Sequence, residues 1–470
     1  MIVLRKNLNR ATSFLGQSIW HLEWVCIFCA IILILVWPLS GAIAARNIAL
    51  GLGCSASLTW MFFARPKISL QIILPALCLL GVPLWLWAHY MFWPTDIQAQ
   101  LYDLQGTWLR VSFLVIMGTV LGFMVAGSPK KLAWVWSAMV ALSFVTLGKY
   151  LLDIWRLDVF VMNDFRFPFK YKSAAVYFLM CPFLLACGTL HYCIFIRASS
   201  KHRVRRDLGL GLGMVVLLAT CFADFIAARS LNAILLASLL CVILLLIYFS
   251  YYIQLSKTHP FSYWALPVLA LLVLCASLTL FWQYDQKYEQ KLSNIISDMQ
   301  VASKIHQYPD WRRDPAYQGS STPSDGLGRP VNRSTYERTA WFIKGVSLLQ
   351  DHPLGAGFSH LAFRYFMHQE NPNLALNKTH SGWLDYALGL GLPGLALTWF
   401  AMGLVFYRSI NSSKQEENYA WNGFVGAWIL GGVWLVWWPT EVSEREFIEH
   451  LFFIISFLAI LALPNQKNTA

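Results

Sequence analysis

The chain is dominated by runs of about twenty mostly apolar residues, and these runs limit what it can fold into more than any other feature. A helix needs about 20 such residues to cross the hydrocarbon core of a bilayer. Only 13% of the 470 residues are charged and the mean hydropathy is +0.52, whereas soluble domains carry about 25% charged residues. We therefore predict an all-α polytopic membrane protein with about 12 transmembrane helices, near residues 20–40, 42–63, 69–91, 108–127, 132–152, 173–196, 208–226, 230–252, 262–282, 382–407, 419–438 and 447–464.

The apolar runs divide the chain into three parts. Residues 1–282 would hold transmembrane helices 1–9, residues 283–379 form a long polar segment, and residues 380–470 would hold helices 10–12. Lys and Arg accumulate in short loops on the cytoplasmic side, and with the N-terminus inside, the basic stretch RASSKHRVRR at 197–206 is inside as well. The polar segment then lies outside. We therefore expect a multi-pass protein of a bacterial inner membrane with one large periplasmic segment.

Several basic residues contradict this charge pattern, because they lie close to the ends of apolar runs on the outer side. Charged groups near hydrocarbon are costly and are often functional. They could reach to lipid phosphates as isolated side chains. Alternatively, they could line a pocket for an anionic lipid-linked substrate, whose pyrophosphate would suit arginine forks. These residues are Lys149, Arg156, Arg166, Lys170, Lys172 and Arg229, of which Arg166, Lys170 and Lys172 gather in NDFRFPFKYKSA.

Arg229 lies in DFIAARSLNA, between two apolar runs that leave room for only a tight turn. It is either a side chain that reaches to lipid head groups or a ligand for phosphate. Ser230 and Asn232 add neutral donors beside it, which favours the phosphate hypothesis.

The first half of the polar segment, 283–333, is rich in Pro, Gly and Ser, and such a composition predicts an irregular loop. The tract 318–328 is expected to be flexible, and the DWRRD cluster at 310–314 is most simply a solvated surface.

The second half of the polar segment predicts two amphipathic helices. Ser334 and Glu337 have the spacing of a capping box, so that a helix would run from there to about Gln350. Arg338 would then lie in the first turn, where free backbone N–H groups already favour an anion. A second, shorter helix is predicted over 359–369.

His380 stands where the polar segment meets the tenth apolar run, in NKTHSGWLDYALGLGLPG. A histidine at such an interface can be purely structural. A neutral imidazole, with an ordinary pKa of about 6.5, can also accept a proton from a sugar hydroxyl at neutral pH. Asp385 follows at five residues instead of four, so helical spacing does not identify the group that orients His380.

Motifs for metals and nucleotides are not found in the sequence. There is no D-x-D pair, no His-x-x-x-His and no P-loop, which are patterns that hold divalent metals or nucleotide phosphates. We therefore expect no cofactor, no metal and no nucleic-acid partner. The donor would already be energised in the membrane, and Arg and Lys would neutralise its leaving group.

Three motifs together resemble the O-antigen ligase and polymerase superfamily. They are Arg338 with Trp341, the turn DHPLGAG at 351–357, and THSGWLDYALGLGLPG at 379–394. The family pattern has an Arg ahead of a Trp, an "hPlxGxG" turn, and a His-Asn or His-Ser start to a span that ends in "lGlxG". The number of spans and the late polar segment extend the resemblance to most of the chain.

Within that superfamily the chain looks most like a ligase that moves O-antigen from undecaprenyl pyrophosphate to the lipid A–core oligosaccharide. The resemblance implies a GT-C-like membrane glycosyltransferase that is metal-independent and inverting. It implies that His380 is the general base and that Arg338 and Arg229 bind the pyrophosphate. A basic segment of the family is matched only loosely, by Arg166, Lys170 and Lys172.

Other functions share this chemistry or this architecture. An O-antigen polymerase or a protein O-oligosaccharyltransferase would use the same donor with another acceptor. A transporter or flippase of lipid-linked glycans would form no bond, but such proteins often carry inverted repeats with broken helices at the midplane, and no such repeat is evident.

Overall fold

Helices make up every regular element that the described residues of the computed structural model contain, apart from two isolated β-bridges. This confirms the all-α prediction. The structure describes residues 2–39, 41–158, 165, 167–199, 204–255, 291–313, 323–374, 376–414 and 417–463, with scattered positions between 268 and 283.

Ten helices in the described part of the chain are long and apolar enough to cross a membrane. They coincide with ten of the twelve predicted runs, so the chain is a polytopic membrane protein. The predicted run 262–282 lies mostly outside the described residues, and the run 447–464 corresponds to a 17-residue helix, α16. The helices of the bundle are α1 Ile2–Val36, α2 Ile43–Ala64, α3 Leu70–Phe92, α4 Ile97–Asp103, the π-helix η1 Leu104–Trp108, α5 Leu109–Ala126, α6 Pro129–Leu157, α7 Lys172–Ser199, α8 Val204–Ala227, α9 Leu231–Leu255, α14 Gly382–Ser412, α15 Glu417–Val436 and α16 Arg445–Leu461.

The centre of the bundle is formed by helices that are apolar on every side. All residues of α16 from Phe447 to Leu461 are buried, and residues 174–190 of α7 are buried as well. A helix that is hydrophobic all round belongs in the interior of a large protein. α16 packs along α5, and α7 packs against α15 and α8, so the last helix of the chain is a core element.

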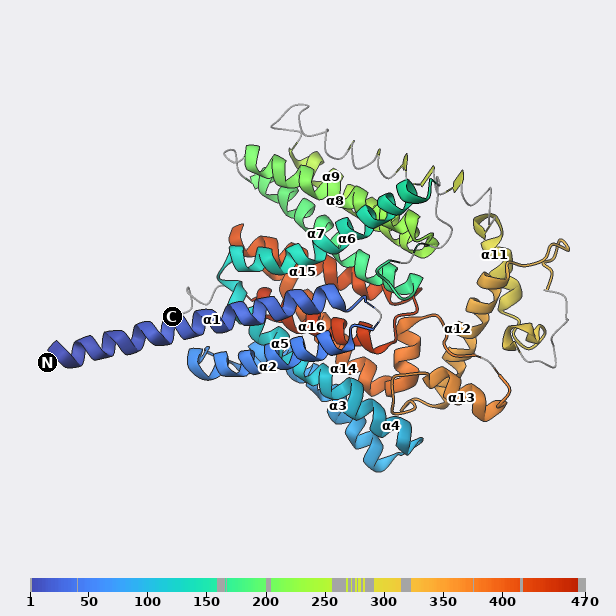
Figure 1. Cartoon of the computed structure of the whole chain (residues 1–470). Coiled ribbons are helices and arrows are strands. Elements are labelled where there is room, and N and C mark those ends of the chain that lie inside the picture. The colour runs from blue at the N-terminus through green and yellow to red at the C-terminus, as the bar shows by residue number, and fades with distance from the viewer. Residues whose placement is uncertain are drawn as a thin grey trace.

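The polar segment forms a separate layer at the end of the bundle opposite to the start of α1 (Figure 1). It contains α11 Lys291–Ala302, the 3-10 helix η2 Pro309–Arg312, α12 Arg333–Asp351 and α13 Ala362–Glu370. These helices share a hydrophobic core that includes Trp311, Trp341 and Phe363, and this core rests on Leu384 and Leu388 of α14.

The expectation of an irregular loop over 283–333 is therefore wrong in part. α11 forms because its apolar residues fall on one face and pack against α12. Of the tract 318–328, residues 318–322 lie outside the described residues.

The helix predicted from Ser334 is present as α12, but its N-terminus differs from the predicted capping box. The cap is Asn332, whose side-chain oxygen accepts a hydrogen bond from the Thr335 backbone N–H at 3.2 Å. Asn caps a helix at least as well as Ser, and Glu337 is engaged by two arginines instead of the cap. Arg338 consequently lies in the second turn of α12, not in the first. The second predicted helix, 359–369, is present as α13.

α14 is broken at Gly391, which has a φ of +71°. The turn 353–357 fills the break. The backbone N–H groups of Ala356 and Gly357 donate to the carbonyls of Leu388 and Gly389, both at 2.8 Å. Leu392 N–H donates back to the Pro353 carbonyl, also at 2.8 Å. Irregular backbone is tolerated at membrane depth only where protein satisfies it, and this turn does so.

The two glycine-rich motifs are thus two sides of one contact. Gly355 and Gly391 both have a positive φ, and a Cβ atom on either would overlap the backbone of the other segment.

Candidate active site

His380 is the last residue but one before α14, and its backbone is held in an uncommon conformation. Its φ is +62°, which is rare for a residue other than glycine and marks functional sites when the surroundings impose it. Here Asp385 imposes it, because one carboxylate oxygen accepts hydrogen bonds from both the backbone N–H and the hydroxyl of Thr379, each at 2.8 Å. Asp385 therefore fixes the backbone beside His380 and not its ring.

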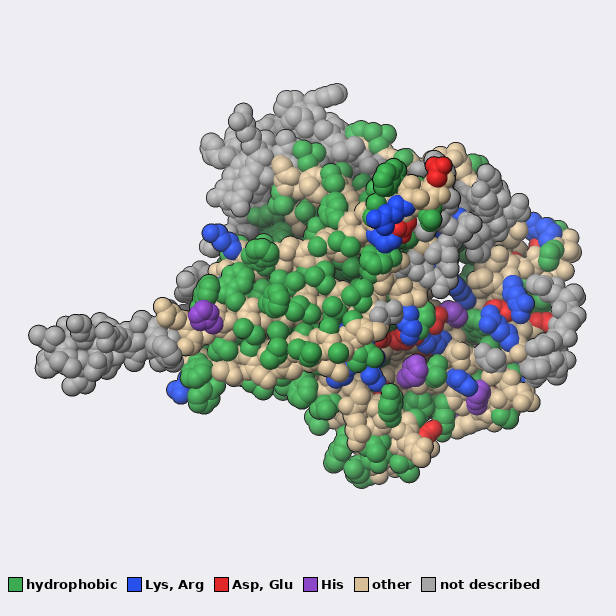
Figure 2. Space-filling view, in the orientation of Figure 1, with side chains coloured by type: hydrophobic (Ala, Val, Ile, Leu, Met, Phe, Trp, Pro, Cys, Tyr) green, Lys and Arg blue, Asp and Glu red, His purple; other side chains and the backbone are tan. Residues whose placement is uncertain are grey.

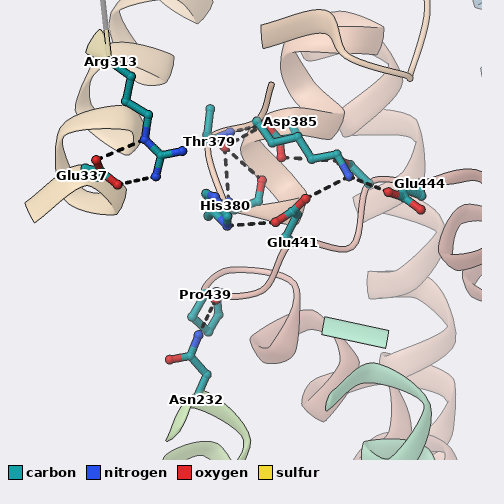
Figure 3. A network of polar contacts seen from close by, with 12 residues as sticks. Asn232, Arg313, Glu337, Thr379, His380, Asp385, Pro439, Glu441 and Glu444 are labelled. Carbon is teal, nitrogen blue, oxygen red and sulfur yellow. Dashed lines mark hydrogen bonds and ion pairs between the residues drawn. The ribbon is translucent and has the colours of Figure 1, made fainter. Parts of the chain in front are cut away.

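The ring of His380 is oriented by Glu441. His380 Nδ1 lies 2.9 Å from Glu441 Oε2 (Figure 3). Glu441 belongs to the loop 437–444 between α15 and α16, which the start of α14 holds in place: Gly382 N–H donates to the Thr440 carbonyl at 2.9 Å. Burial alone would raise the pKa of Glu441, but the His380 hydrogen bond and the charge of Lys378 outweigh it and lower the pKa to about 2. Glu441 is therefore a carboxylate at neutral pH.

Lys378 balances the negative charge of this loop. Its ammonium group lies 3.1 Å from Glu441 and 3.0 Å from Glu444, and only 8% of its side chain is exposed. Burial lowers the pKa of Lys378, but the two carboxylates outweigh that effect and raise it. The lysine stays charged and fixes the carboxylate that in turn orients His380.

Trp341 closes the site from the side of the polar segment. Its ring is stacked on the imidazole of His380, with the two centroids 5.1 Å apart and an angle of 19° between the planes. The indole N–H of Trp341 donates to the Trp311 carbonyl at 2.9 Å. The imidazole is thus held by a carboxylate at its edge and by an indole on its face.

A pocket of about 540 Å³ opens beside the imidazole. It brings together Arg338 and His380, two of the residues that the sequence predicted as functional. Charged side chains gather at this end of the molecule, whereas the visible flank of the bundle is largely apolar (Figure 2). The pocket is lined by Arg313, Arg333, Ser334, Glu337, Arg338, Trp341 and His380.

Arg229 does not line the pocket. It has a φ of +50° in the turn between α8 and α9, as the sequence predicted a tight turn there. Asn232, three residues on, donates a hydrogen bond at 2.9 Å to the carbonyl of Pro439 (Figure 3). The turn that carries Arg229 therefore contacts the loop that carries Glu441.

The basic segment before α7 is placed only in part. Arg166 lies outside the described residues. Lys170 is exposed, with its ammonium group 4.7 Å from the ring centroid of Tyr171. A hydrogen bond with Tyr171 raises the pKa of Lys170, and the charges of Glu444 and Glu446 add to that effect. Lys172 is exposed at the start of α7. Neither lysine lines the pocket of His380.

Several residues of the site were missed in the sequence, namely Arg313, Arg333, Lys378, Glu441 and Glu444. Glu441 and Glu444 lie in EVSERE, a charged run immediately before the last apolar run, and the cost of charges near a membrane could have indicated them. Arg313 lies in DWRRD, and the interpretation of this cluster as a solvated surface is wrong in part. Trp311 is buried, and Arg313 lies over the ring of Trp341, 4.9 Å from its centroid.

The fold and the site together define a polytopic membrane protein with a histidine–carboxylate pair beside an arginine-lined pocket at one end of its bundle. Residues 212–399 match the family model described as O-antigen ligase, which confirms the resemblance and identifies this region as one of the O-antigen ligase family. The match supports a glycosyltransferase-like, ligase- or polymerase-type function in lipopolysaccharide biosynthesis. It includes Arg229, Arg338 and His380, whereas Glu441 lies beyond it. A search of curated proteins found no match to the chain.

The first prediction concerns Glu441. We expect Glu441→Gln to lower glycan transfer about 10²-fold, because an amide no longer favours the required tautomer of His380. The effect should be smaller than the ~10⁴-fold loss seen for the corresponding change in a buried catalytic triad, since Glu441 is partly exposed. Glu444→Gln is the matched control: it removes the other partner of Lys378 without touching His380. Equal losses in the two variants would contradict the assigned role.

A second prediction concerns pH and stability. The pKa of Glu441 is lowered from 4.5 to about 2 on folding, so its contacts stabilise the protein above about pH 4.5 and are lost as the pH falls toward 2. The difference in melting temperature between the wild type and Glu441→Gln should therefore shrink as the pH falls from about 5 toward 2. A difference that stays constant down to pH 3 would contradict the assigned charge state.

Proposed function

We propose that the protein is an O-antigen ligase, which transfers O-antigen from undecaprenyl pyrophosphate to the lipid A–core oligosaccharide on the periplasmic face of the inner membrane. The observation that carries this proposal is the pairing of His380 with the carboxylate of Glu441 in the pocket that also contains Arg338. A positioned base next to a fixed positive charge is what a glycosyl transfer from a pyrophosphate requires.

In this proposal His380 removes the proton of the acceptor hydroxyl. Because Nδ1 donates its hydrogen to Glu441, the lone pair is on Nε2. The hydroxyl proton moves to Nε2 while the oxygen forms a bond to the anomeric carbon, and the bond from that carbon to the pyrophosphate oxygen breaks with inversion. The electron pair leaves with the pyrophosphate, and the imidazolium that forms is stabilised by Glu441.

The departing pyrophosphate gains negative charge as the glycosidic bond breaks. Arg338 is suited to neutralise it, because it lines the pocket beside His380. Arg229 would act from the α8–α9 turn, which touches the loop of Glu441. We retain Lys170 and Lys172 as more distant contributors to the binding of the anionic lipid head group. The step needs no metal, since the arginines supply the positive charge.

The arrangement of the bundle supports the proposed orientation. The polar segment lies at one end, and the start of α1 and the end of α16 lie at the other (Figure 1). With basic N-terminal residues in the cytoplasm, the pocket faces the periplasm, and a lipid-linked donor can reach it from the membrane.

Reconstitution tests the proposal directly. Purified protein in lipid vesicles, supplied with undecaprenyl-pyrophosphate-linked O-antigen and lipid A–core, should yield the joined lipopolysaccharide. A protein that moves the donor across the bilayer but joins nothing would be a transporter, and the proposal would fail.

A deletion strain separates the ligase from related enzymes. Loss of a ligase leaves rough lipopolysaccharide and accumulated lipid-linked O-antigen. A core that carries a single repeat would instead indicate a polymerase. Normal lipopolysaccharide with loss of a glycosylated protein would indicate a protein O-oligosaccharyltransferase.

A further inference from the structure

Two arginines in the pocket share one buried carboxylate. Arg313 donates from Nε to Glu337 Oε1 at 3.1 Å and from Nη2 to Glu337 Oε2. Arg333 donates from Nε to Glu337 Oε1 at 2.8 Å. The side chain of Glu337 is only 5% exposed. Burial would raise the pKa of Glu337, but the two arginines outweigh it and lower the pKa. Glu337 is therefore ionised and holds both guanidinium groups in place.

This cluster keeps an excess positive charge that solvent and ligands can reach. Two arginines and one glutamate leave the cluster with a net charge of +1. The side chains of Arg313 and Arg333 are 45% and 70% exposed, and both line the pocket of His380. The nearby pair of Arg329 and Asp325, by contrast, is electrically balanced. The arrangement suits one further anionic group, because a guanidinium fork fixed by a buried carboxylate is already ordered for binding.

The cluster shares the pocket of His380 with Arg338, whereas Arg229 does not line that pocket. Arg313 contacts Trp341, and Trp341 is stacked on His380. In Figure 3 the Arg313–Glu337 pair and Asn232, which follows Arg229 by three residues at the start of α9, are drawn on different sides of His380. An inverting displacement places the attacking oxygen and the leaving group on opposite sides of the anomeric carbon. If pyrophosphate departs toward Arg229, the side of Arg313 belongs to the acceptor.

We propose that Arg313 and Arg333 form an anion subsite that binds a phosphate or carboxylate group carried by the acceptor glycan close to the hydroxyl that receives the O-antigen. This inference rests on the proposed transferase function and adds to it a charge requirement on the acceptor. In the proposed function Arg229 and Arg338 bind the pyrophosphate, so we assign the other two arginines of the pocket to the acceptor glycan.

The test compares acceptors in the vesicle assay. The lipid A–core acceptor is used intact, after phosphatase treatment, and after reduction of its carboxyl groups. For the wild type, kcat/KM should fall after the treatment that removes the recognised group. A fall after phosphatase treatment identifies that group as a phosphate, and a fall after reduction identifies it as a carboxylate. We call the acceptor that lacks the recognised group the depleted acceptor. The ratio of kcat/KM for the intact acceptor to kcat/KM for the depleted acceptor should be about tenfold lower in Arg333→Gln than in the wild type, as expected for the loss of one charge-assisted contact. Arg333→Lys should give an intermediate ratio, because it keeps the charge and loses the fork.

Arg329→Gln is the matched control, since it removes an exposed arginine of the same segment that does not line the pocket. Its ratio should equal that of the wild type. The subsite is disproved if the wild type uses intact and depleted acceptors equally well, if Arg333→Gln leaves the ratio unchanged, or if Arg329→Gln lowers it to the same extent. These results differ from failure of the proposed function, in which the wild type joins no glycan to any acceptor.

Discussion

Replacement of His380 by alanine should lower the rate of glycan transfer about 10³-fold, within the range of 10² to 10⁴ that positioned acid–base groups contribute. The reason is that the side chain is the only described imidazole in the pocket and that Glu441 and Trp341 both fix its ring. The loss should appear in kcat measured in vesicles with a saturating donor. The KM for the donor should change little, because Arg338 remains in place.

A second variant at position 380 is needed, because alanine would disturb the backbone there. The φ of +62° at His380 disfavours alanine, whereas asparagine tolerates this region well. His380→Asn should therefore keep the local structure and lose activity to the same extent. His306→Ala replaces an exposed histidine of the same segment and should retain wild-type activity. If folded His380→Asn protein transferred glycan within threefold of the wild-type rate, His380 would not be the base.

Replacement of Gly391 by alanine should cause the largest loss of stability. Gly391 has a φ of +71° and a ψ of 175°, a region that is essentially confined to glycine and costs another residue roughly 1–3 kcal/mol, and overpacking adds about 1–3 kcal/mol. The new Cβ would overlap the backbone of Leu354, which cannot move without breaking the turn 353–357. We expect a strongly lowered melting temperature in detergent, or no folded protein at all.

Gly403 provides the control for this variant, because it lies in the same helix and a Cβ there meets no atom within 4 Å. Gly403→Ala should be neutral or slightly stabilising, since glycine inside a helix costs about 0.5–1 kcal/mol relative to alanine. Equal melting temperatures for Gly391→Ala and the wild type would show that the contact with the turn is not needed.

Much of the fold follows from the sequence, because a chain that spans a lipid bilayer can form only a few kinds of structure. In hydrocarbon every backbone group must be paired within the segment, so an apolar run of sufficient length forms a helix. The glycines of LGLGLPG suggested an unusual end to a span, but the break at Gly391 was not predicted. Its cause is tertiary, since the carbonyls that it exposes are satisfied by a turn that comes earlier in the chain. The predicted cap of α12 was wrong for a similar reason, because Glu337 pairs with Arg313 and not with the backbone at the helix start.

Some residues of the candidate site could likewise be predicted from the sequence, and others could not. His380 and Arg338 could be predicted because each belongs to a motif with fixed neighbours. Glu441 could not be assigned to His380, because the two residues are separated by the whole of α14 and α15 and only the packing of the loop 437–444 brings them together. Asp385 was nearer in sequence and was the natural candidate, yet it holds the backbone of Thr379.

The break in α14 also determines which part of the molecule His380 moves with. The half-helix from Gly382 to Leu390 is tied to the turn 353–357 and to the loop 437–440 by backbone hydrogen bonds. The remainder of α14 is separated from it by a joint at Gly391. Leu392, the first residue of that remainder, is bonded to Pro353 of the same turn, so we expect a tilt of the rest of α14, for example in a bilayer of different thickness, to reach the imidazole only through this turn. In mechanical terms the base belongs with the turn and the loop that hold the start of α14, although its chain continues directly into a candidate span.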